Sequence, residues 1–204
     1  MKELLVADDH RMIRKGLIIT CQTEFGIKQI DEATSCNEIM VALKKKRYTH
    51  AIFDMVLTDG TTIEILPNIR NLYPDLKILI LSMQPFAMYR STLEHYGVRQ
   101  FISKAASERE TLKMLQDFFY NTAEIPRRFG LGETAFGKLT PREVEVLHYL
   151  LEGKGSNEIA ETLNMKQNTI STFKKRIFEK SKTKSVLELK EWVSVNQQIF
   201  DINS

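Results

Sequence analysis

Cysteine, tryptophan and long apolar runs are scarce in this chain of 204 residues, which contains two cysteines and one tryptophan. Cys21 and Cys36 do not have the spacing of metal ligands and are too few for a disulfide framework. No apolar run approaches the ~18 residues that a membrane-spanning helix needs. The rest of the composition, with 43% hydrophobic and 27% charged residues, is that of a globular protein and excludes collagen-like and wholly disordered proteins. We therefore expect a cytoplasmic protein with reduced cysteines.

The first 120 residues alternate short apolar runs with segments of helical periodicity. The apolar runs predict strands at Leu4–Ala7, Gln29–Glu32, His50–Phe53, Lys77–Ser82 and Gln100–Ser103. The segments between them predict helices near residues 11–24, 36–47, 61–72, 86–96 and 108–120. Continuous apolar strands that alternate with helices form parallel sheets covered on both faces. We therefore predict a doubly wound, five-stranded α/β domain over residues 1–120.

The composition changes after this domain. The segment 121–137 contains Pro126 and two adjacent arginines without a sustained period, and we predict that it is a linker. Every element over residues 138–204 has a helical pattern. The first begins with Thr140-Pro141-Arg142-Glu143, which combines an N-cap, a proline at the first helical position and a capping-box glutamate. We therefore predict a second, all-α domain over residues 138–204.

Polar residues with complementary chemistry follow the predicted strands. Asp8 and Asp9 come directly after the first strand, and Asp54 comes directly after the third. Ser82 ends the fourth strand and Lys104 follows the fifth, so all five fall on the carboxyl edge of the sheet. Crowded carboxylates need a cation, and their hard oxygen ligands suit Mg²⁺. A carboxylate beside Mg²⁺ and a lysine can attack a phosphoryl group and form an aspartyl phosphate.

Residues 1–120 resemble the receiver domain of bacterial two-component response regulators, which has a CheY-like (flavodoxin-like) fold. The residues that carry the resemblance, in order, are Asp8, Asp9, Asp54, Ser82 and the run Phe101-Ile102-Ser103-Lys104. The resemblance implies that Asp54 accepts a phosphoryl group from a sensor histidine kinase. It also implies the remaining roles: metal ligands Asp8, Asp9, Asp54 and the Val56 carbonyl, the switch pair Ser82 and Phe101, and the phosphate contact Lys104.

Some positions depart from the receiver pattern. Thr58 and Thr62 stand four and eight residues after the acceptor, where the family often has proline and glycine. Asp59-Gly60 still offers a turn, so we expect this loop to be present but less rigid. Met83 stands where the family usually has a small residue, and we expect it to narrow the mouth of the site. We interpret His10 as a surface or packing residue.

A strongly basic stretch lies within the predicted second domain. Residues 166–184 carry seven lysines and arginines against Glu179 alone, a net charge of +6. Positive charge that is concentrated in so short a stretch predicts a surface that binds a polyanion. Residues 139–196 resemble the LuxR-type helix-turn-helix domain of the NarL/FixJ class of response regulators. The stripe of Ile170, Phe173 and Ile177 faces inward, so the opposite side of this helix is available for the major groove of DNA.

The second resemblance implies double-stranded DNA as a partner. It places base-reading residues at Ser171, Thr172 and Lys175. The candidates for phosphate contacts, which position the protein without reading sequence, are Lys166, Asn168, Thr169, Lys174, Arg176 and Lys180. A target with two half-sites further implies a homodimer when the protein is phosphorylated.

Two other functions compete with a phosphorylation-switched transcription regulator. One is a Mg²⁺-dependent phosphohydrolase with an aspartate nucleophile. Haloacid-dehalogenase-like phosphatases place an acidic proton donor two residues after the nucleophile, where this chain has Val56, so we expect slow hydrolysis and a switch rather than an enzyme. The other is an atypical receiver that binds DNA without phosphorylation. The complete acidic set argues against it, whereas Thr58 and Met83 leave it open.

Overall fold

The computed structural model describes residues 2–83, 86–120 and 135–202, with side chains up to residue 196 in the last helix. The chain divides into two compact units. The first consists of Met1–Met83 and Leu93–Ile125, and the second consists of Gln84–Thr92 and Pro126–Ser204.

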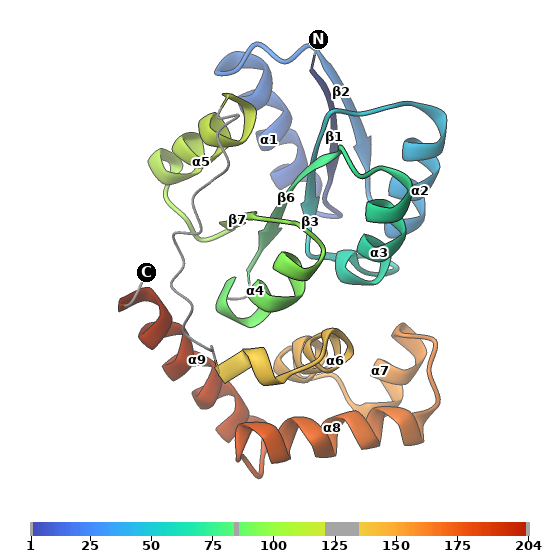
Figure 1. Cartoon of the computed structure of the whole chain (residues 1–204), viewed down its shortest axis with the longest axis vertical. Helices are drawn as coiled ribbons and strands as arrows, with labels where there is room; N and C mark the ends of the chain where they lie inside the picture. Colours follow the sequence, from blue (N-terminus) through green and yellow to red (C-terminus); the bar gives the residue numbers. More distant parts are fainter. Residues whose placement is uncertain (1, 84–85, 121–134, 203–204) are drawn as a thin grey trace. The chain divides into compact units, whose positions relative to one another are not determined.

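The first unit is built on a five-stranded parallel sheet with the strand order β2-β1-β3-β6-β7 (Figure 1). Its strands are β1 (Glu3–Ala7), β2 (Gln29–Ala33), β3 (His50–Asp54), β6 (Lys77–Ser82) and β7 (Gln100–Ser103). Each begins within one residue of its predicted start, and the predicted α/β sheet is confirmed. A short antiparallel hairpin of β4 (Val56–Leu57) and β5 (Gly60–Thr61), which was not predicted, follows β3 directly.

Five helices alternate with the strands: α1 (Arg11–Thr23), α2 (Cys36–Lys45), α3 (Thr62–Leu72), α4 (Phe86–His95) and α5 (Glu108–Tyr120). In Figure 1, α1 and α5 lie on one side of the sheet, and α2 and α3 lie on the other. Strand residues such as Val6 and Ile52 belong to one buried cluster with Cys21, Leu115 and Phe118 from α1 and α5. Because both faces of the inner strands are covered, β1, β3 and β6 are buried along most of their length, whereas the edge strand β2 contains Gln29, Asp31 and Glu32 and is only partly buried.

The described C-terminal part of the second unit is all helical. Its elements are the 3-10 helix η1 (Ala135–Lys138) and the helices α6 (Pro141–Leu151), α7 (Ser156–Thr162), α8 (Gln167–Ser181) and α9 (Val186–Ile202). Ile159 of α7 and Ile170 and Ile177 of α8 are fully buried, as their spacing predicts, whereas Phe173 of the same predicted stripe is only partly buried. The capping box before α6 is present, because the Glu143 N–H donates to Thr140 Oγ1 and the Thr140 N–H donates to the Glu143 carboxylate. The predicted all-α domain is confirmed.

The predicted linker 121–137 falls largely outside the described residues, which resume at residue 135. Its last three residues belong to η1, where Phe136 is buried. The ring centroid of Phe136 lies 4.8 Å from that of Trp192 in α9. This end of the predicted linker is therefore packed onto the last helix. Among the described helices, none is both long and apolar enough to cross a membrane.

Candidate functional site

The predicted acidic residues meet at the carboxyl edge of the sheet. Asp8 directly follows β1, and Asp54 is the last residue of β3. The register pairs Asp54 with Leu81, so Ser82 lies one step further along β6 at the same edge. The backbone N–H of Lys104 donates to the Ser82 carbonyl at 2.8 Å. Four segments distant in sequence are therefore joined here by the register of the parallel strands.

Lys104 is held between two buried carboxylates. Its Nζ lies 2.5 Å from Asp54 Oδ2 and 2.9 Å from Asp8 Oδ2. Asp8 is fully buried and Asp54 is 4% exposed. Burial raises the pKa of Asp54 to about 6, although the hydrogen bond and the charge of Lys104 oppose this change. Burial by itself lowers the pKa of Lys104, but the two carboxylates outweigh it and the pKa is raised. Lys104 is therefore a fixed cation in the site.

The acidic cluster has the ligand atoms of a divalent-cation site. Ligand atoms of Asp8, Asp9, His10 and Asp54 all lie within 4.8 Å of one another. Oδ2 of Asp8 and Oδ1 of Asp9 are buried, and each has one nitrogen beside it, Lys104 Nζ at 2.9 Å and His10 Nδ1 at 2.7 Å. Three carboxylates against one lysine leave an excess of negative charge, and oxygen ligands with this charge fit Mg²⁺.

His10 joins this cluster, although the sequence suggested only a surface or packing role. Its side chain is 66% exposed, so it does lie at the surface, but Nδ1 is 2.7 Å from Asp9 Oδ1. Its backbone N–H donates to Asp8 Oδ1 at 2.8 Å. The signal that could have placed it was its position directly after the acidic pair, where the chain turns from β1 into α1.

The other predicted site residues occupy neighbouring strands and the hairpin. Ser82 is 2% exposed, and Phe101 is buried in β7, where it pairs with Ile80 of β6. The Val56 N–H donates to Asp54 Oδ1 at 3.4 Å, which brings the start of the hairpin to the carboxylate. The side chain of Met83, directly after Ser82, is largely exposed.

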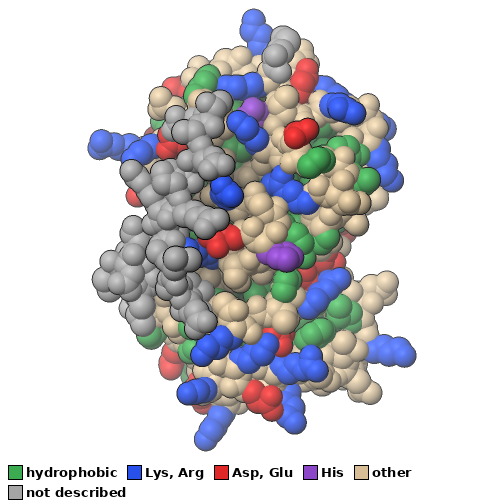
Figure 2. Space-filling view, viewed as in Figure 1, with side chains coloured by type: hydrophobic (Ala, Val, Ile, Leu, Met, Phe, Trp, Pro, Cys, Tyr) green, Lys and Arg blue, Asp and Glu red, His purple; other side chains and the backbone are tan. Residues whose placement is uncertain are grey.

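The predicted DNA-contacting residues lie on α8 and at the residue before it. Those with exposed side chains are Lys166, Asn168, Thr169, Ser171, Thr172, Lys175 and Arg176, and those with partly exposed side chains are Lys174 and Lys180. Figure 2 shows Lys and Arg side chains gathered over α8 at the bottom of the view. The buried stripe of Ile170 and Ile177 leaves this face to solvent.

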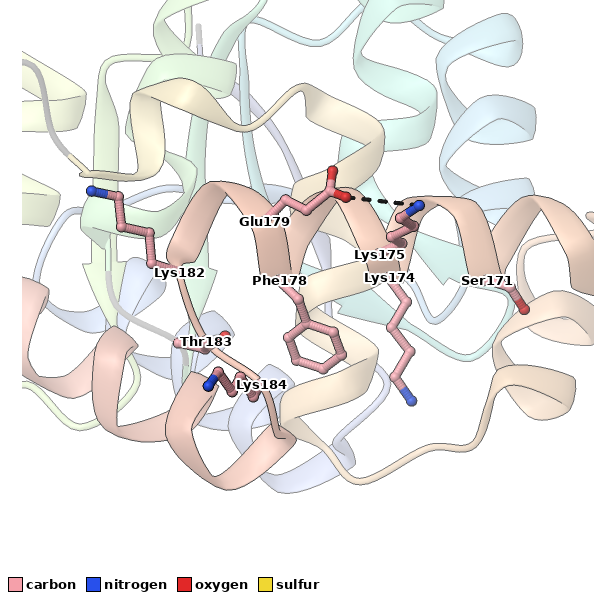
Figure 3. Close-up of a pocket in the computed structure, with 8 residues that line it drawn as sticks. All are labelled: Ser171, Lys174, Lys175, Phe178, Glu179, Lys182, Thr183 and Lys184. Atoms are coloured by element: carbon pink, nitrogen blue, oxygen red, sulfur yellow. Dashed lines mark ion pairs between the residues drawn. The ribbon is translucent and has the colours of Figure 1, made fainter.

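The basic surface continues beyond α8 into the turn before α9. A pocket of about 540 Å³ is lined there by Ser171, Lys174, Lys175, Phe178, Glu179, Lys182, Thr183 and Lys184 (Figure 3). The side chains of Phe178 and Lys174 project to the same side of α8, with Lys174 Nζ 5.8 Å from the ring centroid. Lys182 and Lys184 belong to the basic stretch, but the sequence-based set of DNA contacts did not include them.

One predicted phosphate contact, Lys180, is paired inside the helical part of the second unit. Its Nζ lies 2.6 Å from Oε2 of Glu143, whose side chain is 2% exposed. Burial would raise the pKa of Glu143, but the hydrogen bond from Lys180 and those from Thr140 outweigh burial and lower it. The pair joins the start of α6 to the end of α8, 37 residues away.

Two of the predicted base readers also have partners on α8. The Thr172 hydroxyl donates to the Asn168 carbonyl at 2.9 Å, so its oxygen lone pairs face outward as acceptors. Lys175 Nζ lies 3.9 Å from a Glu179 carboxylate oxygen, and both side chains are exposed (Figure 3). An exposed pair of this kind is weak, so Lys175 can exchange Glu179 for another acceptor.

Comparison with protein families divides the chain in the same two parts. Residues 4–116 match the family model of the response regulator receiver domain, which covers more than half of the chain. Residues 137–193 match the model of the bacterial regulatory proteins of the luxR family. The response regulator UvrY of Escherichia coli (strain K12) is 27% identical over 205 residues, which cover 93% of this chain and 92% of that protein.

Solved structures with the same fold include RcsB of Salmonella typhimurium, described for its conformational dynamism in DNA interaction. It has a TM-score of 0.77 and 23% sequence identity, and the match covers 96% of this chain and 99% of RcsB. A structure of an RcsB–DNA complex has a TM-score of 0.75 at 23% identity, with 95% and 98% of the two chains covered. At this level of identity, the likeness concerns the fold.

Proposed function

The chain is a two-component response regulator of the NarL/FixJ class, and from this premise we propose that phosphorylation of Asp54 by a sensor histidine kinase controls its binding to double-stranded DNA. The observation that carries the proposal is the ion pairing of Lys104 with Asp8 and Asp54 inside a buried acidic cluster. The same chain carries an exposed basic helix, α8, that can enter a major groove.

Asp54 supplies the nucleophile. One of its carboxylate oxygens forms a bond to phosphorus, while the bond between phosphorus and the donor, a histidine nitrogen of the kinase, breaks. Lys104 then contacts a phosphoryl oxygen, and the Ser82 hydroxyl donates to another. Bound Mg²⁺ would neutralise charge on the phosphoryl oxygens. The residues proposed to hold it are Asp8, Asp9, Asp54 and the carbonyl of Val56.

The phosphorylated protein acts as a switch rather than a turnover enzyme. Val56, two residues after the acceptor, has no proton to give to a leaving group, so hydrolysis of the acyl phosphate is slow. The phosphoryl group draws Ser82 inward and lets Phe101 change its orientation, which alters the surface of the receiver.

The α8 helix reads DNA with Ser171, Thr172 and Lys175. Phosphate contacts come from Lys166, Asn168, Thr169, Lys174, Arg176 and Lys180. The exposure of α8 supports these roles. Lys180 is the exception, because its ammonium group is paired with the Glu143 carboxylate and must break this ion pair, or share it, to contact a DNA phosphate. Two half-sites in the target favour a homodimer after phosphorylation, because tethering two modules raises their effective concentration. We propose a cytoplasmic location, where the protein can meet both the kinase and DNA.

Intact mass measured after incubation with acetyl phosphate and MgCl₂ tests the acceptor. We expect the wild type to gain the mass of one phosphoryl group and Asp54→Asn to gain none, because an amide is not a nucleophile. Asp9→Ala should require more Mg²⁺ for the same gain. Phosphorylation of Asp54→Asn to the wild-type level contradicts the assignment, and an unchanged Mg²⁺ dependence removes Asp9 from the metal site.

Sedimentation and DNA binding of the full chain, with and without beryllofluoride, test the switch. We expect dimerisation and tighter operator binding in the presence of beryllofluoride, which replaces the phosphoryl group on Asp54. Equal affinity and an equal oligomeric state in both conditions would identify a constitutive regulator instead.

Selection of DNA sequences by variants of α8 tests the reading of bases. Lys175→Ala should cost about 1–3 kcal/mol on the preferred site and relax the choice at one base pair. Lys174→Ala is the matched control, because it should weaken specific and random DNA alike and reduce the salt slope by about one. Equal losses of Lys175→Ala on both kinds of DNA would make Lys175 a phosphate contact.

A further inference from the structure

Side-chain hydrogen bonds hold the tip of the β4–β5 hairpin, which follows the strand that ends with Asp54. The Asp59 carboxylate accepts hydrogen bonds from the backbone N–H groups of Cys36, at 2.6 Å, and Asn37, at 2.9 Å, in the first turn of α2. The Thr58 hydroxyl donates to the Thr34 carbonyl at 3.2 Å. Thr58 stands where the receiver pattern often has proline. The chain therefore restrains this turn by hydrogen bonds to Thr34 and to the first turn of α2 rather than by a proline ring.

The base of the hairpin is fastened by Thr62, which is fully buried. Its hydroxyl donates to the carbonyl of Asp54 at 2.5 Å, and its N–H donates to the carbonyl of Met55 at 2.9 Å. The Met55 N–H donates in turn to the Leu81 carbonyl of β6 at 2.8 Å. Three successive backbone polar groups after the Cα atom of Asp54 are thus held, two of them by Thr62.

We propose that Thr62 is a positioning residue for phosphoryl transfer: its hydroxyl fixes the Asp54 carbonyl and so sets the direction of the Asp54 carboxylate and the start of the hairpin at Val56. This inference rests on the proposed role of Asp54 as the acceptor. A glycine, the residue often found here in receivers, has no hydroxyl for this bond. A buried carbonyl that loses its donor is costly, so the end of β3 would shift to regain a partner.

The geometry explains why such a shift would matter. Asp54 Oδ2 lies 2.5 Å from Lys104 Nζ, and Asp54 Oδ1 accepts from the Val56 N–H at 3.4 Å. A rotation of the Asp54 peptide group therefore displaces the carboxylate from Lys104 and displaces Val56 from the proposed metal site together. Chemistry that depends on placement loses rate steeply with small displacements.

Three variants of the full chain test the proposal. Thr62→Val keeps the shape of the side chain and removes the hydroxyl, and Thr62→Ser restores the hydroxyl. Thr49→Val is the matched control, because Thr49 Oγ1 also donates to a strand carbonyl, that of Glu3, at the opposite edge of the same sheet. The measurements are the rate of phosphoryl gain from acetyl phosphate at saturating Mg²⁺, and the Mg²⁺ dissociation constant by calorimetry without any phosphodonor.

We expect Thr62→Val to slow phosphoryl transfer about two- to tenfold and to weaken Mg²⁺ binding in the same range, as the loss of one hydrogen bond predicts. Thr62→Ser should recover most of both, and Thr49→Val should change neither. Wild-type values for Thr62→Val overturn the proposal, and so does a defect that Thr62→Ser does not relieve. If Thr62→Val does not fold, the exchange of the Thr62 hydroxyl proton with water is measured by NMR in the wild type. We expect slow exchange, because the proton is held in the bond to the Asp54 carbonyl. Rapid exchange would contradict this bond.

These outcomes are separate from a failure of the proposed function. If Asp54→Asn is phosphorylated like the wild type, the acceptor assignment is wrong, whatever Thr62 does. If Asp54→Asn is inert and Thr62→Val behaves like the wild type, Asp54 remains the acceptor and only the positioning role of Thr62 is wrong.

Discussion

The acidic site and the basic face of α8 both concentrate charge of one sign, but they hold it in opposite ways. In the acidic site, Asp8 and Asp54 are buried and share Lys104 at 2.9 and 2.5 Å. On α8, the Lys175 side chain is 78% exposed, and its acidic neighbour Glu179 lies 3.9 Å away. Buried charges interact strongly, whereas exposed charges are screened by water and salt. Removing a charge should therefore change stability at the first region and ligand binding at the second.

The strongest test of this contrast is Lys104→Met. Removing the cation leaves buried carboxylates without compensation, so we expect the free energy of unfolding of the first unit to fall by about 3–5 kcal/mol in Mg²⁺-free buffer. Added MgCl₂ should restore part of the loss, because a ligand of the folded state stabilises it. Urea denaturation followed by far-UV circular dichroism measures both effects. Lys45→Met, an exposed lysine of α2, is the control, and equal effects of the two variants would contradict the contrast.

A second test concerns Lys180, which resembles Lys104 more than its neighbours on α8. Lys180→Met leaves the Glu143 carboxylate buried without its cation, and we expect a loss of about 3 kcal/mol from the second unit. Lys174→Met should change stability by less than about 0.5 kcal/mol. Trp192, the one tryptophan of the chain, reports this unit by fluorescence during denaturation. If the two variants are equally stable, Lys180 is held only by weak surface contacts.

A third test uses pH at His50, a buried histidine at the start of β3. Burial lowers the pKa of His50 to about 4, and the positive charges of Lys77 and Lys2 act in the same direction. Unfolded histidine has a pKa near 6.5, so the unfolded state binds more protons below that pH. The contribution of His50 to stability should be nearly constant above about pH 7.5 and should fall by about 2 kcal/mol between pH 7 and pH 5, whereas Asp54, whose pKa is raised to about 6, acts in the opposite direction as the pH falls. His50→Phe should lack this component, and His95→Asn, an exposed histidine, should keep it.

The smallest expected effect comes from Lys182, which ends α8 in the left-handed conformation with φ +59°. Glycine adopts this conformation without steric cost, so Lys182→Gly should raise the stability of the second unit by about 0.5–1 kcal/mol. It also removes a cation from the basic surface, so DNA binding should weaken and lose about one unit of salt slope. A variant that is destabilised shows instead that the lysine stem has a packing role.

The two regions also differ in how far the sequence could predict them. The parallel direction of the strands places Asp8, Asp54 and Lys104 at one edge, because the carboxyl ends of parallel strands lie at the same edge of a sheet. The hairpin at Val56–Thr61 was missed because strands of two residues are too short to show a period. Thr62 was predicted only as a departure from a pattern, since its bond to the Asp54 carbonyl depends on how α3 begins.

On α8, the net charge predicted the surface but not the state of each lysine. The pairing of Lys180 with Glu143 spans 37 residues and leaves no local signal in the sequence. The helical stripe left Lys182 available on the same side as Lys174 and Lys175, but neither Lys182 nor Lys184, which both follow the helix, was assigned a DNA contact from the sequence. Exposure follows from periodicity, but a partner across the fold does not.

The strand order of the sheet has a consequence for the time course of folding. Within this sheet β1 is synthesised before the other four strands, yet it pairs with both β2 and β3. Contact between Glu3 and Thr49 joins residues 46 positions apart. At typical rates of translation, the ribosome adds β3 roughly 2–10 s after β1. During that interval the edge of β1 that pairs with β3 in the folded protein has no partner strand.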